Sequence, residues 1–162
     1  MTSTSGPQPD VRYFHGGVPG LNPGDIIAPH PPNRVDGCPI CAAKAAGEQP
    51  VVPGLGNVDP LTERPDRVYI TTDREYGRFY ASKYWLGDLY VVEPMGEVEE
   101  SAEDFFPTWC AEAAVVVSVV SRAVRLSDKQ RRTLSRRWLE LENAKRRERL
   151  GIAPRGEGSD DA

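Results

Sequence analysis

The chain has 162 residues, a formal net charge of −4, 39% hydrophobic residues and 27% charged residues. This size favours a single domain that buries its core without disulfides or a structural metal. The acidic balance argues against nucleic-acid binding driven by overall charge, and no run reaches the roughly 18 consecutive apolar residues that a membrane span needs. Because the first residues resemble no secretory signal and the cysteines number three, we expect a cytoplasmic protein without a disulfide framework. We also expect a monomer.

Glycine and proline are concentrated at the start of the chain, where residues 1–66 hold 21 of the 30. Proline removes a backbone donor and glycine weakens both helices and strands, so this part is predicted to be mostly loop and short strand. We expect a flexible N-terminus over 1–10, one domain over 11–150 and a disordered tail over 151–162. Within the domain, residues 28–64 form a Pro/Gly-rich insertion.

Apolar and β-branched runs predict the strands. They cover residues 11–15, 21–27 (a turn followed by a short strand), 68–71, 89–94 and 113–124. We expect Gly16 and Gly17 to end the first strand, and Pro94 and Gly96 to end the fourth. Residues 97–104, with five carboxylates, then form an acidic connection.

Two capping boxes predict helices. Thr72 and Glu75 open a helix over 73–85, whose aromatic face is expected to pack in the core, although one member could wall a ligand pocket. Tyr76, Phe79, Tyr80 and Tyr84 make up this face. The elements together predict an α+β fold with a compact mixed or antiparallel β core.

The second capping box, Ser127 with Gln130, opens a helix that runs to about Leu150. The stripe of Leu134, Trp138 and Leu141 should dock this helix on the sheet. The segment carries nine basic and four acidic residues, and its second half should project into solvent. Apart from Trp138 in the apolar stripe, no aromatic residue is interleaved with the basic ones, so a solvated face is a better interpretation than a nucleic-acid interface.

Several catalytic classes are excluded by missing motifs. The sequence has neither the G-x-G-x-x-G dinucleotide fingerprint nor the G-x-x-x-x-G-K-[ST] phosphate loop. With only two histidines, His15 and His30, it also has no metalloprotease helix motif.

One ordered set of stretches resembles a known family. The stretches are YFHGG (13–17), LNPGDII (21–27), RVYITT (67–72), FYASKY (79–84) and LYVVEPMGEVEE (89–100). In this order, over about residues 11–101, they resemble the diphtheria-toxin-like ADP-ribosyltransferases with a His-Tyr-acid triad, and most closely the small rifamycin-modifying bacterial enzymes. The resemblance implies an ADP-ribosyltransferase-like core with a C-terminal helix. It also implies NAD as substrate, with transfer of ADP-ribose to an acceptor and release of nicotinamide.

The resemblance also implies roles for individual residues. His15 would hold a ribose hydroxyl, the Gly16 backbone, beside Gly17, would hydrogen-bond the nicotinamide amide, and Tyr69 would stack on the nicotinamide ring. Tyr80 and Tyr84 are the aromatic residues expected beside that ring. A carboxylate would stabilise the oxocarbenium-like centre that forms when the bond between nicotinamide and ribose breaks.

The acid of the triad falls in the run after 89–94. A gapless match places Ser101 at the acidic position, and a shift of one residue makes Glu100 the catalytic anion. Glu103, Glu99 and Glu93 remain alternatives. The resemblance suggests a rifamycin-type small molecule as the acceptor, and a protein or a nucleic acid remains an alternative.

The alternative function is a catalytically inactive module with the same fold, which holds a nucleic-acid or protein partner. Cys38, Cys41 and His30 could supply three zinc ligands, with Asp36 or Cys110 as the fourth. The chain lacks a second Cys-x-x-Cys or a histidine pair, so we expect reduced thiols and no metal site.

Overall fold

The computed structural model describes residues 10–29, 64–83 and 87–152, together with seven positions between 37 and 48. The N-terminus before residue 10, most of the insertion and the tail from residue 153 lie outside the described residues. The flexible N-terminus, the insertion and the disordered tail therefore stay predictions.

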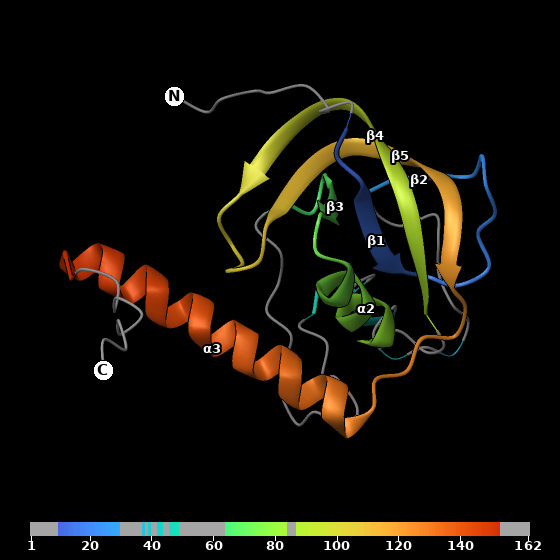
Figure 1. The fold of residues 1–162 in the computed structure, drawn as a ribbon. Coiled ribbons are helices and arrows are strands. Elements are labelled where there is room, and N and C mark those ends of the chain that lie inside the picture. Colours follow the sequence, from blue (N-terminus) through green and yellow to red (C-terminus); the bar gives the residue numbers. More distant parts are fainter. Residues whose placement is uncertain are drawn as a thin grey trace.

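The described chain forms an α+β fold, as expected (Figure 1). Its elements are β1 (Tyr13–Gly17), β2 (Ile26–Ile27), β3 (Val68–Thr71), α2 (Arg74–Lys83), β4 (Asp88–Ser101), β5 (Thr108–Ser121) and α3 (Asp128–Leu150). All strand pairs in the described part are antiparallel, so this sheet is antiparallel rather than mixed.

The sheet closes on itself. Strand β5 pairs with β4 along one edge and with β3 and β2 along the other, while β1 joins β3 to β4. Cys110 marks the closure, because it lies opposite Tyr69 of β3 and also opposite Glu99 of β4. In Figure 1 the long β4 and β5 strands curve around the shorter ones.

The closed sheet surrounds the main apolar core. Its buried members are Tyr13, Ile27, Val68, Ile70, Tyr90, Val92, Val98, Ala111, Ala114 and Val116. A second cluster lies on the outer side, where Ala81 of α2 packs with Phe14, Leu89 and Val124. Helix α2 thus covers the outer face of β1, as Figure 1 shows.

Glycine and proline do not end the strands where we expected. Strand β1 continues through Gly16 and Gly17, and β4 continues through Pro94 and Gly96 to Ser101. A shift of register between Met95 and Val98, with Gly96 at φ 76°, absorbs the irregularity as a bulge. The predicted acidic connection is therefore largely strand, and the turn before β5 is shorter.

Strand β5 also differs from the prediction, because it begins at Thr108 and ends at Ser121 instead of covering 113–124. The strand over 68–71 is confirmed. The one predicted over 21–27 is reduced to the two residues of β2. Among the described strands, the two residues of β2 pair only with β5.

The helix starts differ in detail. Asp73, rather than Thr72, caps α2, because its carboxylate accepts a hydrogen bond from the Tyr76 amide at 3.0 Å. The capping box of Ser127 and Gln130 is confirmed at the start of α3. At its other end, Gly151 adopts the left-handed conformation at φ 67°.

Helix α3 does not dock on the sheet. Trp138 instead packs on Phe105 and Phe106, in the connection between β4 and β5, and on Tyr76 of α2. Arg137 adds an ion pair with the capping residue Asp73. None of the residues of α3 is buried. Among the described residues, no helix is long and apolar enough to cross a membrane.

A buried carboxylate ties three segments together at the start of β4. Asp88, 2% exposed, accepts hydrogen bonds from the amides of Gly20 (2.9 Å) and Ala123 (2.8 Å) and from Nη1 of Arg122 (2.7 Å). Burial raises the pKa of Asp88, but these donors outweigh it and hold the pKa below its ordinary value. The loop after β1 and the turn after β5 therefore depend on a charged Asp88.

Replacing this carboxylate should destabilise the fold. We expect Asp88→Asn to lower the free energy of unfolding by about 2–3 kcal/mol at pH 7, because hydrogen bonds to a charged group are lost and an amide donor faces other donors. Urea denaturation measures the effect.

The pH dependence provides a second measurement. A pKa depressed in the folded state contributes stability that is present above about pH 4, the unfolded value, and is lost as the pH falls through the folded pKa. The stability difference between wild type and Asp88→Asn should therefore shrink on acidification. The exposed Asp10→Asn is the matched control. An equal loss in both variants would contradict a special role for Asp88.

Candidate functional site

His15 lies on β1 and contacts the neighbouring strand β3. Its Nδ1 donates a hydrogen bond to the main-chain carbonyl of Tyr69, with 2.8 Å between the two atoms. A carbonyl oxygen only accepts, so Nδ1 carries a proton, and in the neutral form of the ring Nε2 is the acceptor nitrogen. The ring lies beside Gly17, where a Cβ would come within 2.8 Å of Nε2. Gly17 therefore provides the space for this imidazole.

Gly16 allows close packing between β1 and α2. A Cβ on Gly16 would lie 2.1 Å from the carbonyl oxygen of Gly77 and 2.5 Å from the amide nitrogen of Ala81. Both atoms belong to α2, so the missing side chain is what lets the helix pack closely on β1. This packing does not test the predicted hydrogen bond between the Gly16 backbone and the nicotinamide amide.

Tyr69 extends from β3 on the outer side of the closed sheet, with its hydroxyl in a polar cluster. The hydroxyl donates a hydrogen bond to Oε2 of Glu103 and accepts one from the main-chain N–H of Arg64 at 3.0 Å. Burial, followed by the bond to Glu103, raises the pKa of Tyr69 above its ordinary value. The phenol thus stays protonated and acts as a donor to the carboxylate.

The side chain of His15 bonds to the backbone of Tyr69 and not to the Tyr69 side chain. Strands β1 and β3 share the single pair Phe14 and Thr71. Side chains alternate along a strand, so Tyr69 leaves on the same side as Thr71, whereas His15 leaves on the opposite side from Phe14. The imidazole reaches Tyr69 by its carbonyl, and the two side chains start from opposite faces of the sheet.

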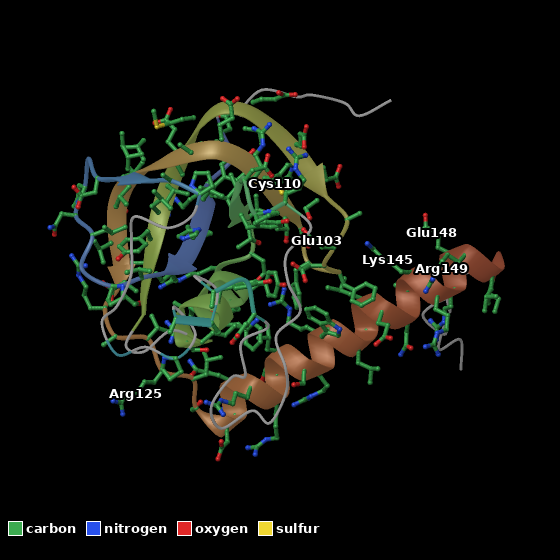
Figure 2. The ribbon with its side chains drawn as sticks, turned by 180° about the vertical axis from the view of Figure 1, so that it is seen from behind. Glu103, Cys110, Arg125, Lys145, Glu148 and Arg149 are labelled. Atoms are coloured by element: carbon green, nitrogen blue, oxygen red, sulfur yellow. The ribbon has the colours of Figure 1, made fainter. Side chains whose placement is uncertain are left out.

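Glu103 is the carboxylate that meets Tyr69. It follows the end of β4, where the Ser101 hydroxyl also donates to its Oε2 at 3.3 Å. Figure 2 shows Glu103 near Cys110, whose thiol lies in the same cluster. Burial raises the pKa of Cys110, so the thiol stays protonated at neutral pH.

The other candidate acids lie elsewhere. Glu99 forms an ion pair with Nη1 of Arg64 at 2.8 Å. It is thus connected to Tyr69 only through Arg64, whose backbone N–H donates to the Tyr69 hydroxyl. Glu100 is exposed on β4 opposite Trp109, and Glu93 is exposed opposite Val115. The structure therefore brings Glu103, and not Glu100, to Tyr69. Strand alternation does not reveal this contact, because Glu103 lies beyond the strand in the turn.

The aromatic face of α2 belongs to the packing between the helices. Tyr76 is 1% exposed and stacks on Phe106. The hydroxyl of Tyr80 donates to Asp104 at 3.3 Å, and burial raises the pKa of that carboxyl group. Tyr84 lies outside the described residues. Tyr80 thus lies beside the turn that carries Glu103, in a neighbouring polar group.

Most of the residues considered for zinc cannot be placed. His30, Asp36, Cys38 and Cys41 lie outside the described residues. Cys110 is a free, buried cysteine on β5. Within the described part of the chain, no group of three or more histidine, cysteine, aspartate or glutamate side chains could hold a metal ion.

No protein-family model matches this chain, and no curated protein sequence matches it either.

The contact between Tyr69 and Glu103 can be measured by a double-mutant cycle. We expect Tyr69→Phe and Glu103→Gln each to lower the free energy of unfolding, with a coupling energy of about 1.5–3 kcal/mol, typical of a hydrogen bond to a charged group. Urea denaturation of the wild type, both single variants and the double variant gives this value. The pair Tyr69→Phe and Glu100→Gln should show coupling near zero, and equal coupling in both cycles would contradict the assignment.

Proposed function

We propose that the protein is an NAD-dependent mono-ADP-ribosyltransferase in which His15, Tyr69 and Glu103 form the His-Tyr-acid set. The observation that carries the proposal is the connection of the three residues. His15 bonds the backbone of Tyr69, and the hydroxyl of Tyr69 bonds Glu103. The three residues are thus linked through β3, with the side chains of His15 and Tyr69 starting from opposite faces of the sheet, and Glu103 takes the role first assigned to Glu100.

The tautomer of His15 suits a sugar hydroxyl. With Nδ1 committed to the carbonyl of Tyr69, Nε2 is the nitrogen that accepts a hydrogen bond. A ribose hydroxyl of NAD is a donor of the required kind. In this proposal His15 orients the ribose and takes no part in proton transfer.

Glu103 supplies the negative charge. When the glycosidic bond of NAD breaks, its electron pair leaves with nicotinamide and the ribose C1′ gains positive charge. A carboxylate held by the hydroxyls of Tyr69 and Ser101 is oriented before the reaction, so it stabilises that charge without reorganisation. The acceptor nucleophile then bonds to C1′ and loses its proton to solvent.

The substrate side of the proposal comprises NAD and an acceptor, which is a rifamycin-type small molecule or a macromolecule. We further propose that the protein works as a monomer in the cytoplasm. The second candidate is a binding module with the same fold and no catalysis. The net positive charge of α3, which carries nine basic and four acidic residues, favours this second candidate, because it offers a partner surface away from the polar cluster.

Nicotinamide release from NAD tests the proposal. We expect the wild type to release nicotinamide in the presence of a rifamycin or a macromolecular acceptor, as measured by chromatography. Glu103→Gln should lower kcat by about 100-fold or more, the usual cost of losing one preorganised electrostatic group. His15→Ala should mainly raise KM for NAD.

Glu100→Gln is the matched control, since it removes one carboxylate from the neighbouring strand and should leave the rate within about twofold. If Glu100→Gln abolishes release and Glu103→Gln does not, the acid is misassigned. If the wild type releases no nicotinamide with any acceptor and NAD does not raise the melting temperature, the binding module replaces the enzyme.

A further inference from the structure

The turn between β4 and β5 carries Glu103 and has little support from the backbone. It comprises residues 102–107, between the end of β4 at Ser101 and the start of β5 at Thr108. Outside the helices and strands, none of the backbone–backbone hydrogen bonds between described residues involves this turn. Its conformation therefore depends on side chains that bond to it from neighbouring elements.

Thr71 of β3 supplies one of these bonds at the far end of the turn. Its hydroxyl donates to the main-chain carbonyl of Pro107, with 2.6 Å between the two oxygen atoms. The same hydroxyl accepts a hydrogen bond from the Asp73 amide at 3.0 Å. Thr71 is only 5% exposed, so both bonds are largely shielded from water. One buried hydroxyl thus joins β3, the turn and the start of α2, and its single proton is used in the bond to Pro107.

Tyr69 and Thr71 hold the two ends of the turn from the same strand. They are two residues apart on β3, so their side chains leave on the same side of the sheet. Tyr69 bonds the Glu103 side chain near the start of the turn, and Thr71 bonds the Pro107 carbonyl at its end. In the register of the sheet, Thr71 lies opposite Thr108, the first residue of β5. The turn is therefore attached to β3 at both ends.

From this geometry we propose that Thr71 is a positioning residue for Glu103, whose carboxylate it keeps in place beside Tyr69. This role rests on the proposed function, in which Glu103 stabilises the positive charge at C1′. Without the Thr71 hydroxyl, the Pro107 carbonyl and the Asp73 amide both lose a buried partner, and the turn is free to shift. A displaced carboxylate keeps its charge but no longer lies where positive charge develops, so the chemical step slows while NAD binding is retained.

The two branches of the Thr71 side chain can be tested separately. Its methyl group faces α2, because a Cβ on Gly77 would lie 3.6 Å from that carbon. Thr71→Val keeps the methyl group and removes the hydroxyl, whereas Thr71→Ser keeps the hydroxyl and removes the methyl group. A role in packing alone predicts the greater loss for the serine variant, and a positioning role predicts the greater loss for the valine variant.

A double-mutant cycle reports the contact of Glu103 with Tyr69 independently of catalysis. The cycle of Tyr69→Phe and Glu103→Gln is repeated by urea denaturation in the Thr71→Val and Thr71→Ser backgrounds. We expect the coupling between Tyr69 and Glu103 to fall by at least half with valine and to be retained with serine. Unchanged coupling in the Thr71→Val background would overturn the proposal, whether or not the protein releases nicotinamide.

Single variants give the second measurement, which also applies if the combined variants do not fold. At saturating NAD, Thr71→Val should lower kcat for nicotinamide release by roughly tenfold or more and leave KM for NAD within about twofold, since a displacement of about 1 Å costs up to about 100-fold in rate. Thr71→Ser should retain kcat within about threefold of the wild type. An equal loss of kcat in the two variants would overturn the proposal in favour of packing.

Thr133→Val is the matched control. The Thr133 hydroxyl also donates to a main-chain carbonyl, that of Lys129 at 3.0 Å, but it does so within α3 and at an exposed position. This variant should change neither the coupling nor kcat, and an effect equal to that of Thr71→Val would overturn the proposal. If the wild type releases no nicotinamide, the proposed function fails, and the cycle alone decides whether Thr71 positions Glu103.

Discussion

The architecture depends on the closure of the sheet at Cys110, where β5 pairs with β3 on one edge and with β4 on the other. Strands paired on both edges leave no backbone donors or acceptors exposed at this point. Closure also sorts side chains by parity. Val68 and Ile70 face the enclosed core, whereas Tyr69 lies with Cys110 on the outer side. The candidate site is thus a consequence of how the sheet closes, since Glu103 follows β4 at the end of the same pairing.

The polar cluster on that outer side is ordered by its own hydrogen bonds. Tyr69 receives a bond from the backbone of Arg64 and gives one to Glu103, which also receives the hydroxyl of Ser101. Two hydroxyl donors on one carboxylate fix the direction of Glu103. Glu99 instead forms an ion pair with Arg64 at 2.8 Å. An oriented anion suits the stabilisation of a developing cation.

Local signals in the sequence predicted much of the fold. The strand at 68–71 and the capping box of Ser127 depend on neighbouring residues alone, and both are confirmed. The lengths of β4 and β5 were wrong, because a bulge and long-range pairing carry β4 past Pro94 and Gly96. The sequence also did not predict that Tyr69 contacts Glu103. Spacing along the chain named Glu103 as an alternative, but only the turn after Ser101 brings it to Tyr69.

Helix α3 bears on the candidate site through its contacts with the turn between β4 and β5. The turn that carries Glu103 continues directly into Phe105 and Phe106, and both rings pack against Trp138 of α3. Asp104, in the same turn, receives the hydroxyl of Tyr80 from α2. The turn is therefore held from both helices, so the position of Glu103 depends on the docking of α3 as much as on β4.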